Sequence, residues 1–136
     1  MEFLLDTNIC IYIIKRKPIE VFEKLRSLPL NSVAVSSITI AELEYGVKKS
    51  SQSQTNQIAL IDFLTPLTIL DFSFEAAIEY GMIRTQLESK GIPIGSLDML
   101  IAAHAKATNL TLVTNNEKEF SRVDGLKVEN WLNRKV

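Results

Sequence analysis

Three acidic residues and one polar run carry the clearest chemical signal in this sequence. Asp6 directly follows a short apolar run, Glu42 and Asp98 lie near the starts of predicted helices, and residues 114–116 (Thr-Asn-Asn) follow another apolar run. Carboxylate and amide oxygens suit Mg²⁺ or Mn²⁺, and Mg²⁺ sites are usually completed by water and substrate phosphates. Carboxylates gathered on a partly buried edge repel one another unless a cation neutralises them. The residue types therefore favour a metal-assisted reaction on a phosphate ester.

These residues can meet only if the fold brings distant segments together. Short apolar runs with β-branched residues predict buried strands at 3–5, 33–35, 68–70 and 111–113. Helical patterns lie at 8–15, 19–28, 40–49, 55–64, 73–90 and 97–108. This alternation predicts an α/β fold with a parallel sheet and helices on both faces. Ligands bind such sheets beside the carboxyl ends of the strands, so the acidic residues are expected to meet there.

The length of 136 residues fits one compact domain, and we expect residues 1–136 to form a single unit. A hydrophobic fraction of 46% against 23% charged residues is typical of a packed globule and excludes disorder for most of the chain. The polar segment 49–56 (KSSQSQTN) predicts a turn between two helices, so that residues around 40–64 form a helical arm. Residues 126–136 are expected to add an edge strand and a last turn.

The charge balance limits the classes of partner. Fifteen Lys and Arg against sixteen Asp and Glu leave a net charge of −1, so any nucleic-acid binding must be local. The basic runs 15–17 and 48–49 are candidates for contacts with an RNA backbone, and solvated faces are the alternative. One cysteine and one histidine permit neither an internal disulfide nor a structural zinc site. Without a secretory leader or a long apolar window, we expect a cytoplasmic protein with no membrane contact.

Each acidic residue also has a purely structural explanation. Asp6 can cap the helix that follows it, and Asp98 can interact favourably with a helix macrodipole. Thr39 and Glu42 have the spacing of a capping box, in which the glutamate would accept from a backbone N–H. For Asp6 and Asp98 taken singly, the structural explanation is the stronger one. The joint pattern of several carboxylates at one edge of the sheet favours a metal site.

Other residues that could do chemistry have simpler interpretations. Asn116 and Glu119 have N-cap and third-residue spacing, so both could hold one short helix together. Cys10 lies in an apolar run and is expected to be a small core residue, and His104 is expected to be a packed or surface histidine rather than a general base. Gly46, inside a predicted helix, hints that something approaches closely there. The sequence contains no serine-hydrolase elbow, Walker loop or dinucleotide-binding fingerprint.

Four blocks of sequence occur in a characteristic order. They are LLDTN at 4–8, SSITIAELEYG at 36–46, IGSLDMLIAAHA at 94–105, and LVTNN at 112–116 with Glu119 and Phe120. Together these blocks resemble the PIN-domain ribonucleases, and most closely the VapC toxins of bacterial toxin–antitoxin pairs. The resemblance spans nearly the whole chain and implies a three-layer α/β/α fold around a parallel sheet of about four or five strands.

The resemblance implies an endoribonuclease that depends on Mg²⁺ or Mn²⁺. Asp6, Glu42 and Asp98 would form the acidic, metal-binding cluster, with Asn8 and Thr114 as polar support. The products would be a 5′-phosphate and a 3′-hydroxyl.

One position departs from the pattern of the family. Many relatives carry a fourth acid two residues after the threonine of the last block, where this chain has Asn116. Its amide oxygen can accept but brings no negative charge, so either the second-metal position is weaker or Glu119 supplies the missing carboxylate. We expect a single ion, held chiefly through Asp6 and Asp98.

The resemblance also implies partners. We expect a homodimer and a cognate VapB-like antitoxin whose C-terminal segment lies in a groove of the toxin and blocks the metal site. A higher assembly with the antitoxin would reach operator DNA only through the antitoxin. The substrate would be a structured RNA of translation such as tRNA.

Two other functions remain open from the sequence. A catalytically weak domain could act mainly as the antitoxin-binding part of a DNA-bound repressor complex, with Asn116 marking lost activity. A receiver-like module would use Asp71 as phosphoacceptor, but such modules carry paired acids after the first strand, and here Asp6 is followed by Thr7 and Asn8.

Overall fold

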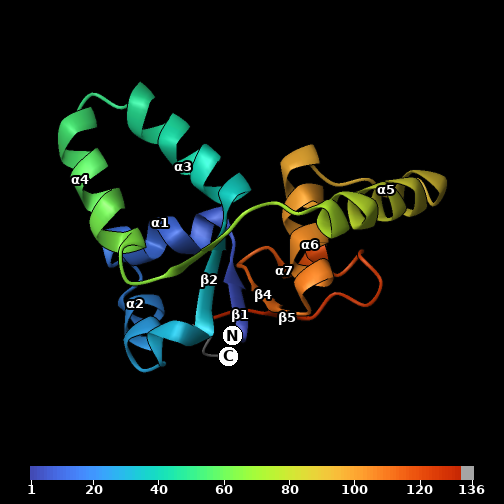
Figure 1. Cartoon of the computed structure of the whole chain (residues 1–136), viewed down its shortest axis with the longest axis horizontal. Coiled ribbons are helices and arrows are strands. Elements are labelled where there is room, and N and C mark those ends of the chain that lie inside the picture. The colour runs from blue at the N-terminus through green and yellow to red at the C-terminus, as the bar shows by residue number, and fades with distance from the viewer. Residues whose placement is uncertain (133–136) are drawn as a thin grey trace.

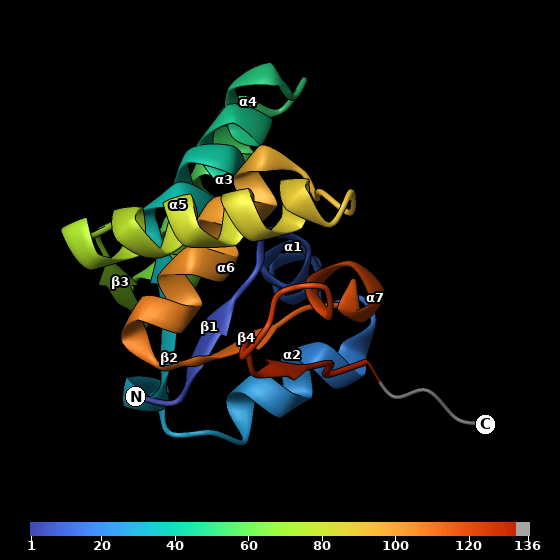
Figure 2. The ribbon, with the colours of Figure 1, turned by 90° about the vertical axis from the view of Figure 1, so that its right-hand side faces the viewer.

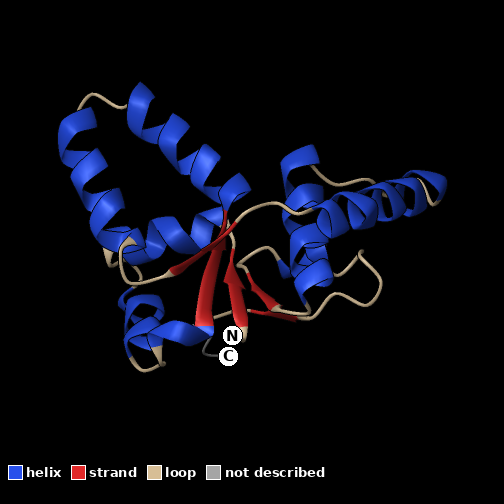
Figure 3. Ribbon diagram, in the orientation of Figure 1, coloured by secondary structure: helices blue, strands red, loops and turns tan. Residues whose placement is uncertain are grey.

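The computed structural model describes residues 1–132 and contains one five-stranded parallel sheet with strand order β3-β2-β1-β4-β5. The strands are β1 (Phe3–Leu5), β2 (Val33–Ser36), β3 (Thr68–Leu70), β4 (Thr111–Val113) and β5 (Val128–Glu129). Figure 3 shows the sheet in red at the centre of the molecule. The four strands predicted at 3–5, 33–35, 68–70 and 111–113 are confirmed, and β5 is the edge strand expected within 126–136. Burial was predicted wrongly for 68–70, because β3 lies at the other edge of the sheet and is only partly buried. A last turn was also expected within 126–136, and residues 133–136 of that segment lie outside the described part of the chain.

Helices cover both faces of this sheet. They are α1 (Thr7–Lys15), α2 (Ile19–Arg26), α3 (Ser37–Lys49), α4 (Ser53–Leu64), α5 (Phe74–Ser89), α6 (Ser96–Thr108) and α7 (Glu117–Phe120), with a short 3₁₀ turn at Leu30–Ser32. Figures 1 and 2 show α1 to α4 on one side of the strands and α5 to α7 on the other. The predicted three-layer α/β/α arrangement is confirmed. Within residues 1–132, no helix is long and apolar enough to cross a bilayer.

The strands β1 and β2 are apolar because both of their faces are buried. Phe3 and Leu5 pack into the core under α1 to α4, whereas Leu4 between them packs into the core under α5 and α6. Successive side chains of a strand point to opposite faces, so three consecutive apolar residues feed two separate cores. The sheet is thereby held from both sides, and the edge formed by its carboxyl ends is fixed in position.

The first turn of α3 differs from the prediction. We expected a helix from residue 40, but α3 begins at Ser37 because the hydroxyl of Ser36 caps it, accepting from the N–H of Ile38 at 3.1 Å. Thr39 is therefore inside the helix, and the capping box proposed for Thr39 and Glu42 does not form. The cap leaves no loop between β2 and α3, so α3 leaves directly from the carboxyl end of its strand.

The α3–α4 hairpin projects from the sheet and corresponds to the predicted arm (Figure 1). Gln57 of α4 joins the two helices, since it accepts from Lys48 at 2.8 Å and donates to Glu44 at 3.3 Å. The turn between the helices spans residues 50–52, within the polar segment that predicted it. The hairpin leaves its inner face open toward α1.

Candidate active site

Asp6 lies at the carboxyl end of β1 and is only 5% exposed. It caps α1, because its Oδ1 accepts from the N–H of Ile9 at 2.9 Å, so the structural explanation offered by the sequence is confirmed. Burial raises the pKa of Asp6, and hydrogen bonds from the Thr114 hydroxyl and from the backbone N–H groups of Ile9 and Asn8 oppose that rise. The negative charge of Glu42 raises the pKa further. Asp6 is thus both a helix cap and a carboxylate with an acidic neighbour.

Glu42 reaches the same edge from α3. Its Oε1 accepts from the hydroxyl of Thr7, the first residue of α1, at 2.7 Å. No role was predicted for Thr7 from the sequence. The sequence did contain a signal for such a role, because Thr7 lies between Asp6 and Asn8 in the first block. A polar residue at the start of α1 is placed to contact the helix that packs beside it. The bond orients Glu42 across the space between α1 and α3.

Asp98 comes from the first turn of α6, on the opposite side of the sheet. Its pKa is raised to about 7, first by burial, then by a hydrogen bond with Glu119 and the charge of Glu119, and then by the charges of Glu42 and Asp6. Gly95 lies beside this carboxylate, since a Cβ there would be 3.4 Å from Oδ2 of Asp98, an ordinary contact distance. The charged groups that raise the pKa of Asp98 are thus all acidic.

Glu119, in α7, is the fourth carboxylate of this cluster. It accepts from the backbone N–H of Gly95 at 3.3 Å and from the side-chain amide of Asn116. Asn116 in turn donates its backbone N–H to Oγ1 of Thr114 at 2.9 Å. Asn116 is the N-cap residue of α7, but its side chain accepts no hydrogen bond from the helix backbone. The capping arrangement predicted for Asn116 and Glu119 is therefore absent, and their two side chains bond to each other instead. The structure therefore brings Glu119, rather than Asn116, against Asp98.

The two residues expected as polar support lie differently. Thr114, at the end of β4, is fully buried, and its side chain hydrogen-bonds to Asp6. Asn8 is exposed at its side chain, and its backbone N–H is what hydrogen-bonds to Asp6. Asp6 and Thr114, at the carboxyl ends of β1 and β4, are thus hydrogen-bonded to each other at the edge of the sheet.

The carboxylates of Asp6, Glu42, Asp98 and Glu119, called the acidic cluster below, fit a hard divalent cation. Each of the other three raises the pKa of Asp98, a repulsion that a cation would relieve. Within residues 1–132, no three His, Cys, Asp or Glu side chains are already arranged as a metal cage. Such a cage is not required by Mg²⁺, which normally binds one or two carboxylates and keeps several waters.

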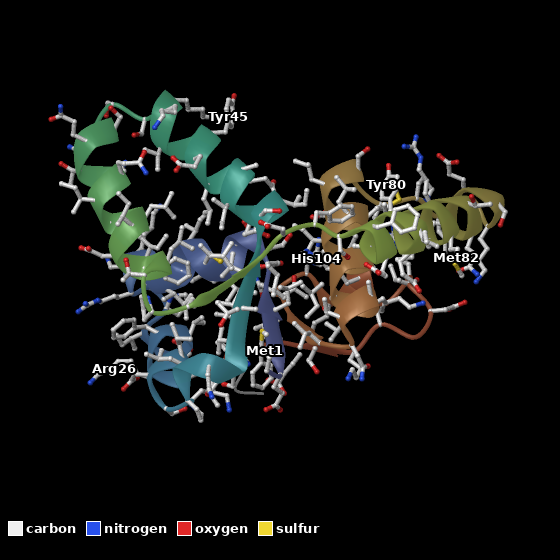
Figure 4. All side chains as sticks on the ribbon, viewed as in Figure 1. Met1, Arg26, Tyr45, Tyr80, Met82 and His104 are labelled. Atoms are coloured by element: carbon white, nitrogen blue, oxygen red, sulfur yellow. The ribbon has the colours of Figure 1, made fainter. Side chains whose placement is uncertain are left out.

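The remaining chemical candidates belong to the core. Cys10 is fully buried and His104 is 1% exposed, which confirms both as packed residues. Figure 4 labels His104 inside the molecule, beside α6. Gly46 is different from the prediction: a Cβ there would meet nothing within 4 Å, so no other part of the described chain approaches it.

Gly46 instead lines an apolar groove of about 290 Å³ between α1, α3 and α4. Ile11, Leu43 and Leu60 supply much of its apolar wall, and Glu42 lies at its border. The groove thus runs from the inner face of the α3–α4 hairpin to the acidic cluster. A segment lying in it would contact both apolar side chains and a catalytic candidate.

Comparison with known proteins identifies the family. The sequence profile described as "PIN domain" matches residues 3–126. The chain belongs to the PIN-domain family. This PIN domain is 51% identical to ribonuclease VapC2 of Rickettsia felis over 132 residues, which cover 96% of this chain and 98% of the relative. It is 42% identical to the tRNA(fMet)-specific endonuclease VapC of Shigella flexneri over 131 residues, covering 96% of this chain and 98% of the relative.

Solved structures of relatives agree with this assignment. The PIN domain superposes with a TM-score of 0.91 on a chain of VapBC2 from Rickettsia felis bound to a promoter DNA fragment, at 49% identity, covering 96% of this chain and 99% of that chain. The TM-score is 0.92 for a chain of DNA-bound VapBC from Salmonella typhimurium, at 42% identity and with 97% and 99% coverage. The resemblance to the VapC ribonucleases seen in the sequence blocks is thereby confirmed, which disfavours a receiver-like module.

Proposed function

We propose that this PIN domain is the ribonuclease toxin of a toxin–antitoxin pair and that it hydrolyses RNA phosphodiester bonds with Mg²⁺ or Mn²⁺. The observation that carries the proposal is the convergence of Asp6, Glu42, Asp98 and Glu119 at one edge of the sheet from four different elements. Similarity over almost the full chain to VapC ribonucleases supports it.

The residues of the acidic cluster have the following proposed roles. Asp6 and Asp98 hold the ion, because they lie at the ends of rigid elements on the two sides of the sheet. Thr7 holds Glu42 toward the same space, and Glu119 supplies the carboxylate that Asn116 lacks. A bound Mg²⁺ or Mn²⁺ supplies a water of lowered pKa and offsets the charge that develops on the phosphate. By resemblance to the PIN-domain ribonucleases, the products would be a 5′-phosphate and a 3′-hydroxyl.

Thr114 and Asn8 favour the ionised form of Asp6 in this proposal. The Thr114 hydroxyl and the Asn8 backbone N–H both lower the pKa of Asp6 against the effect of burial. The ionised form is the one that binds a cation, so these two hydrogen bonds favour metal binding.

A structured RNA such as tRNA is the proposed substrate. The printed name of the Shigella flexneri relative specifies tRNA(fMet), which supports this class without identifying the tRNA. Both basic runs, 15–17 and 48–49, are exposed and are candidates for backbone contacts, and Arg16 of the first run lies over the ring of Phe22. Lys48 is engaged with Glu44 and Gln57, and Lys49 lies over the ring of Tyr45.

A cognate antitoxin is the proposed protein partner, in the cytoplasm where such pairs act on RNA. The groove beside Glu42 would take an apolar antitoxin segment, and a basic antitoxin residue would neutralise the acidic cluster while excluding RNA. Solved VapBC complexes of two relatives with DNA support an assembly that contacts operator DNA through the antitoxin. We also propose that the chain is a single domain that forms a homodimer in this assembly.

One observation favours a second function. Asn116 stands where many relatives carry an acid, so the domain could cleave RNA weakly and serve mainly as the antitoxin-binding half of a repressor complex. Measured cleavage separates these functions, since a repressor component needs no metal-dependent activity.

The test is cleavage of purified tRNA by the purified chain with Mg²⁺, Mn²⁺ or EDTA. We expect cleavage with either metal and none with EDTA, and Asp6→Asn and Asp98→Asn should lose at least about a hundredfold in rate. Asp62→Asn, the same change at an exposed position of α4, should leave the rate unchanged. Wild-type rates in both cluster variants, with the folds intact, would contradict the proposal.

A further inference from the structure

A buried hydrogen bond joins the start of α3 to the middle of α6. Ser36, at the end of β2, is fully buried, and its Oγ lies 2.7 Å from Nδ1 of His104. The same oxygen accepts from the N–H of Ile38 in the first turn of α3. The serine that caps α3 is thus held by a side chain from the other face of the sheet.

A second contact closes this arrangement. The hydroxyl of Ser37 accepts from the backbone N–H of Phe72 at 3.1 Å, and the Phe72 ring meets the His104 ring edge to face, with centroids 5.5 Å apart. We call Ser36, Ser37, Phe72 and His104 the serine–histidine node. It links α3, α6 and the connection between β3 and α5, which pass close to one another near His104 in Figure 4.

The donor and the acceptor of the Ser36–His104 hydrogen bond can be assigned. Because the Ser36 oxygen accepts from Ile38, its own proton is free to be donated to Nδ1 of His104. Nδ1 can accept only in a neutral imidazole, and burial lowers the pKa of His104, which keeps the ring neutral. The backbone of Asp71 hydrogen-bonds to the same ring. At 1% exposure His104 cannot touch a substrate, so any effect on the reaction must pass through other residues.

The two helices tied by the node each carry one residue of the acidic cluster. Glu42 lies six residues after Ser36 in α3, and Asp98 lies six residues before His104 in α6. At 1.5 Å per residue, the backbone positions of Glu42 and Asp98 each lie about 9 Å along the helix from the node. A small rotation of either helix about the node would therefore move one carboxylate relative to the other.

We infer that His104 is a positioning residue of the ribonuclease: together with Ser36 it fixes the separation of Glu42 from Asp98 by tying α3 to α6. The inference rests on the proposed function, since it concerns the carboxylates assigned to RNA hydrolysis. His104 has no contact with RNA in this account and acts only through the helices.

The test compares His104→Phe, Ser36→Ala and the double variant with the wild-type chain. His104→Phe keeps a ring against Phe72 but removes the acceptor, and Ser36→Ala removes a single oxygen. We expect kcat for RNA to fall about ten- to a hundredfold in each single variant while KM stays within about twofold, because misplaced groups slow the reaction more than they weaken substrate binding. Mn²⁺ binding, measured by calorimetry without RNA, should weaken in parallel. The double variant should be no slower than the slower single variant, since each single change already removes the Ser36–His104 bond. Ser36→Ala also removes the cap of α3 on Ile38, so it should be the slower of the two single variants.

Controls separate positioning from lost stability. Ile83→Val, a buried change in α5, should lower Tm without changing kcat or Mn²⁺ affinity. Ser36→Thr retains the hydroxyl and should restore most of the kcat lost in Ser36→Ala. If His104→Phe does not fold, Ser36→Ala and Ser36→Thr still decide the question.

The inference is overturned if the node variants keep kcat and Mn²⁺ affinity near the wild-type values and lose only Tm. A wild-type chain that neither cleaves RNA nor binds Mn²⁺ would overturn the proposed function, and the inference with it. An active wild type with equally active node variants would overturn the inference alone.

Discussion

Asp98 is the residue whose ionisation depends most on its neighbours. Burial and the charges of Glu119, Glu42 and Asp6 all favour its protonated form, and Asp98 and Glu119 share a hydrogen bond that requires a proton on one of them. A metal ion must displace that proton, so ion binding and proton release are coupled in this pair.

The pH dependence follows from the pKa of Asp98, which is about 7 in the folded chain against 3.8 ordinarily. Mn²⁺ affinity should therefore rise as pH increases toward and through about 7, and flatten above it. The metal-free folded chain binds more protons than the unfolded chain between these two values, so its free energy of unfolding should fall as pH rises across that window. Calorimetric Mn²⁺ titrations and denaturant unfolding at several pH values check both statements. A Mn²⁺ affinity that does not change with pH would contradict the first statement, and a free energy of unfolding that does not fall across the window would contradict the second.

Thr7 provides a second prediction at this scale. Thr7→Val removes the hydrogen bond to Glu42 while keeping the shape of the side chain, so kcat for RNA should fall several-fold and the free energy of unfolding should fall by about 1 kcal/mol. Thr85→Val, on the exposed side of α5, is the matched control and should leave kcat unchanged. Steady-state cleavage kinetics measure the effect, and equal kcat values for the two variants would argue against an orienting role for Thr7.

At the scale of elements, the α3–α4 hairpin creates a surface that neither helix forms alone. The groove between this hairpin and α1 is lined mostly by apolar side chains, and Gly46 is one of its lining residues, where an added methyl group would meet no atom within 4 Å. Gly81 in α5 has equally open surroundings but lies outside the groove. Alanine variants at the two glycines therefore distinguish an effect of helix propensity, which both share, from an effect on the groove, which only Gly46→Ala has.

We expect Gly46→Ala and Gly81→Ala each to stabilise the free chain by up to about 1 kcal/mol, because alanine is the better helix former. Only Gly46→Ala should weaken inhibition by the cognate antitoxin, since only its methyl group narrows the groove. Thermal unfolding and titration of ribonuclease activity with antitoxin measure the two effects. Equal inhibition of both variants would contradict the proposed position of the antitoxin.

Across the whole molecule, stability depends on two cores that share one sheet. Leu112 of β4 is fully buried in the core under α5 and α6, whereas Ile69 of the edge strand β3 is 48% exposed. A large buried side chain loses both its transfer free energy and its packing when it is truncated. The central strands should therefore tolerate change far less than the edge.

Leu112→Ala should lower the free energy of unfolding by about 2–5 kcal/mol, and Ile69→Ala by less than about 1 kcal/mol. Chemical denaturation of the metal-free chain measures both values. A similar loss in the two variants would mean that the sheet is not supported mainly by its central strands.

Local patterns in the sequence determined the first four strands, most helix positions and the edge of the sheet at which Asp6, Glu42 and Asp98 lie, because strand and helix periodicities are properties of neighbouring residues. Tertiary structure decided that Thr7 orients Glu42, that Glu119 rather than Asn116 meets Asp98, and that Ser36 is tied to His104. Thr7 and Glu42 are 35 positions apart, and Ser36 and His104 are 68 apart. Contacts at such separations depend on how helices pack across a sheet, and no local pattern encodes that packing.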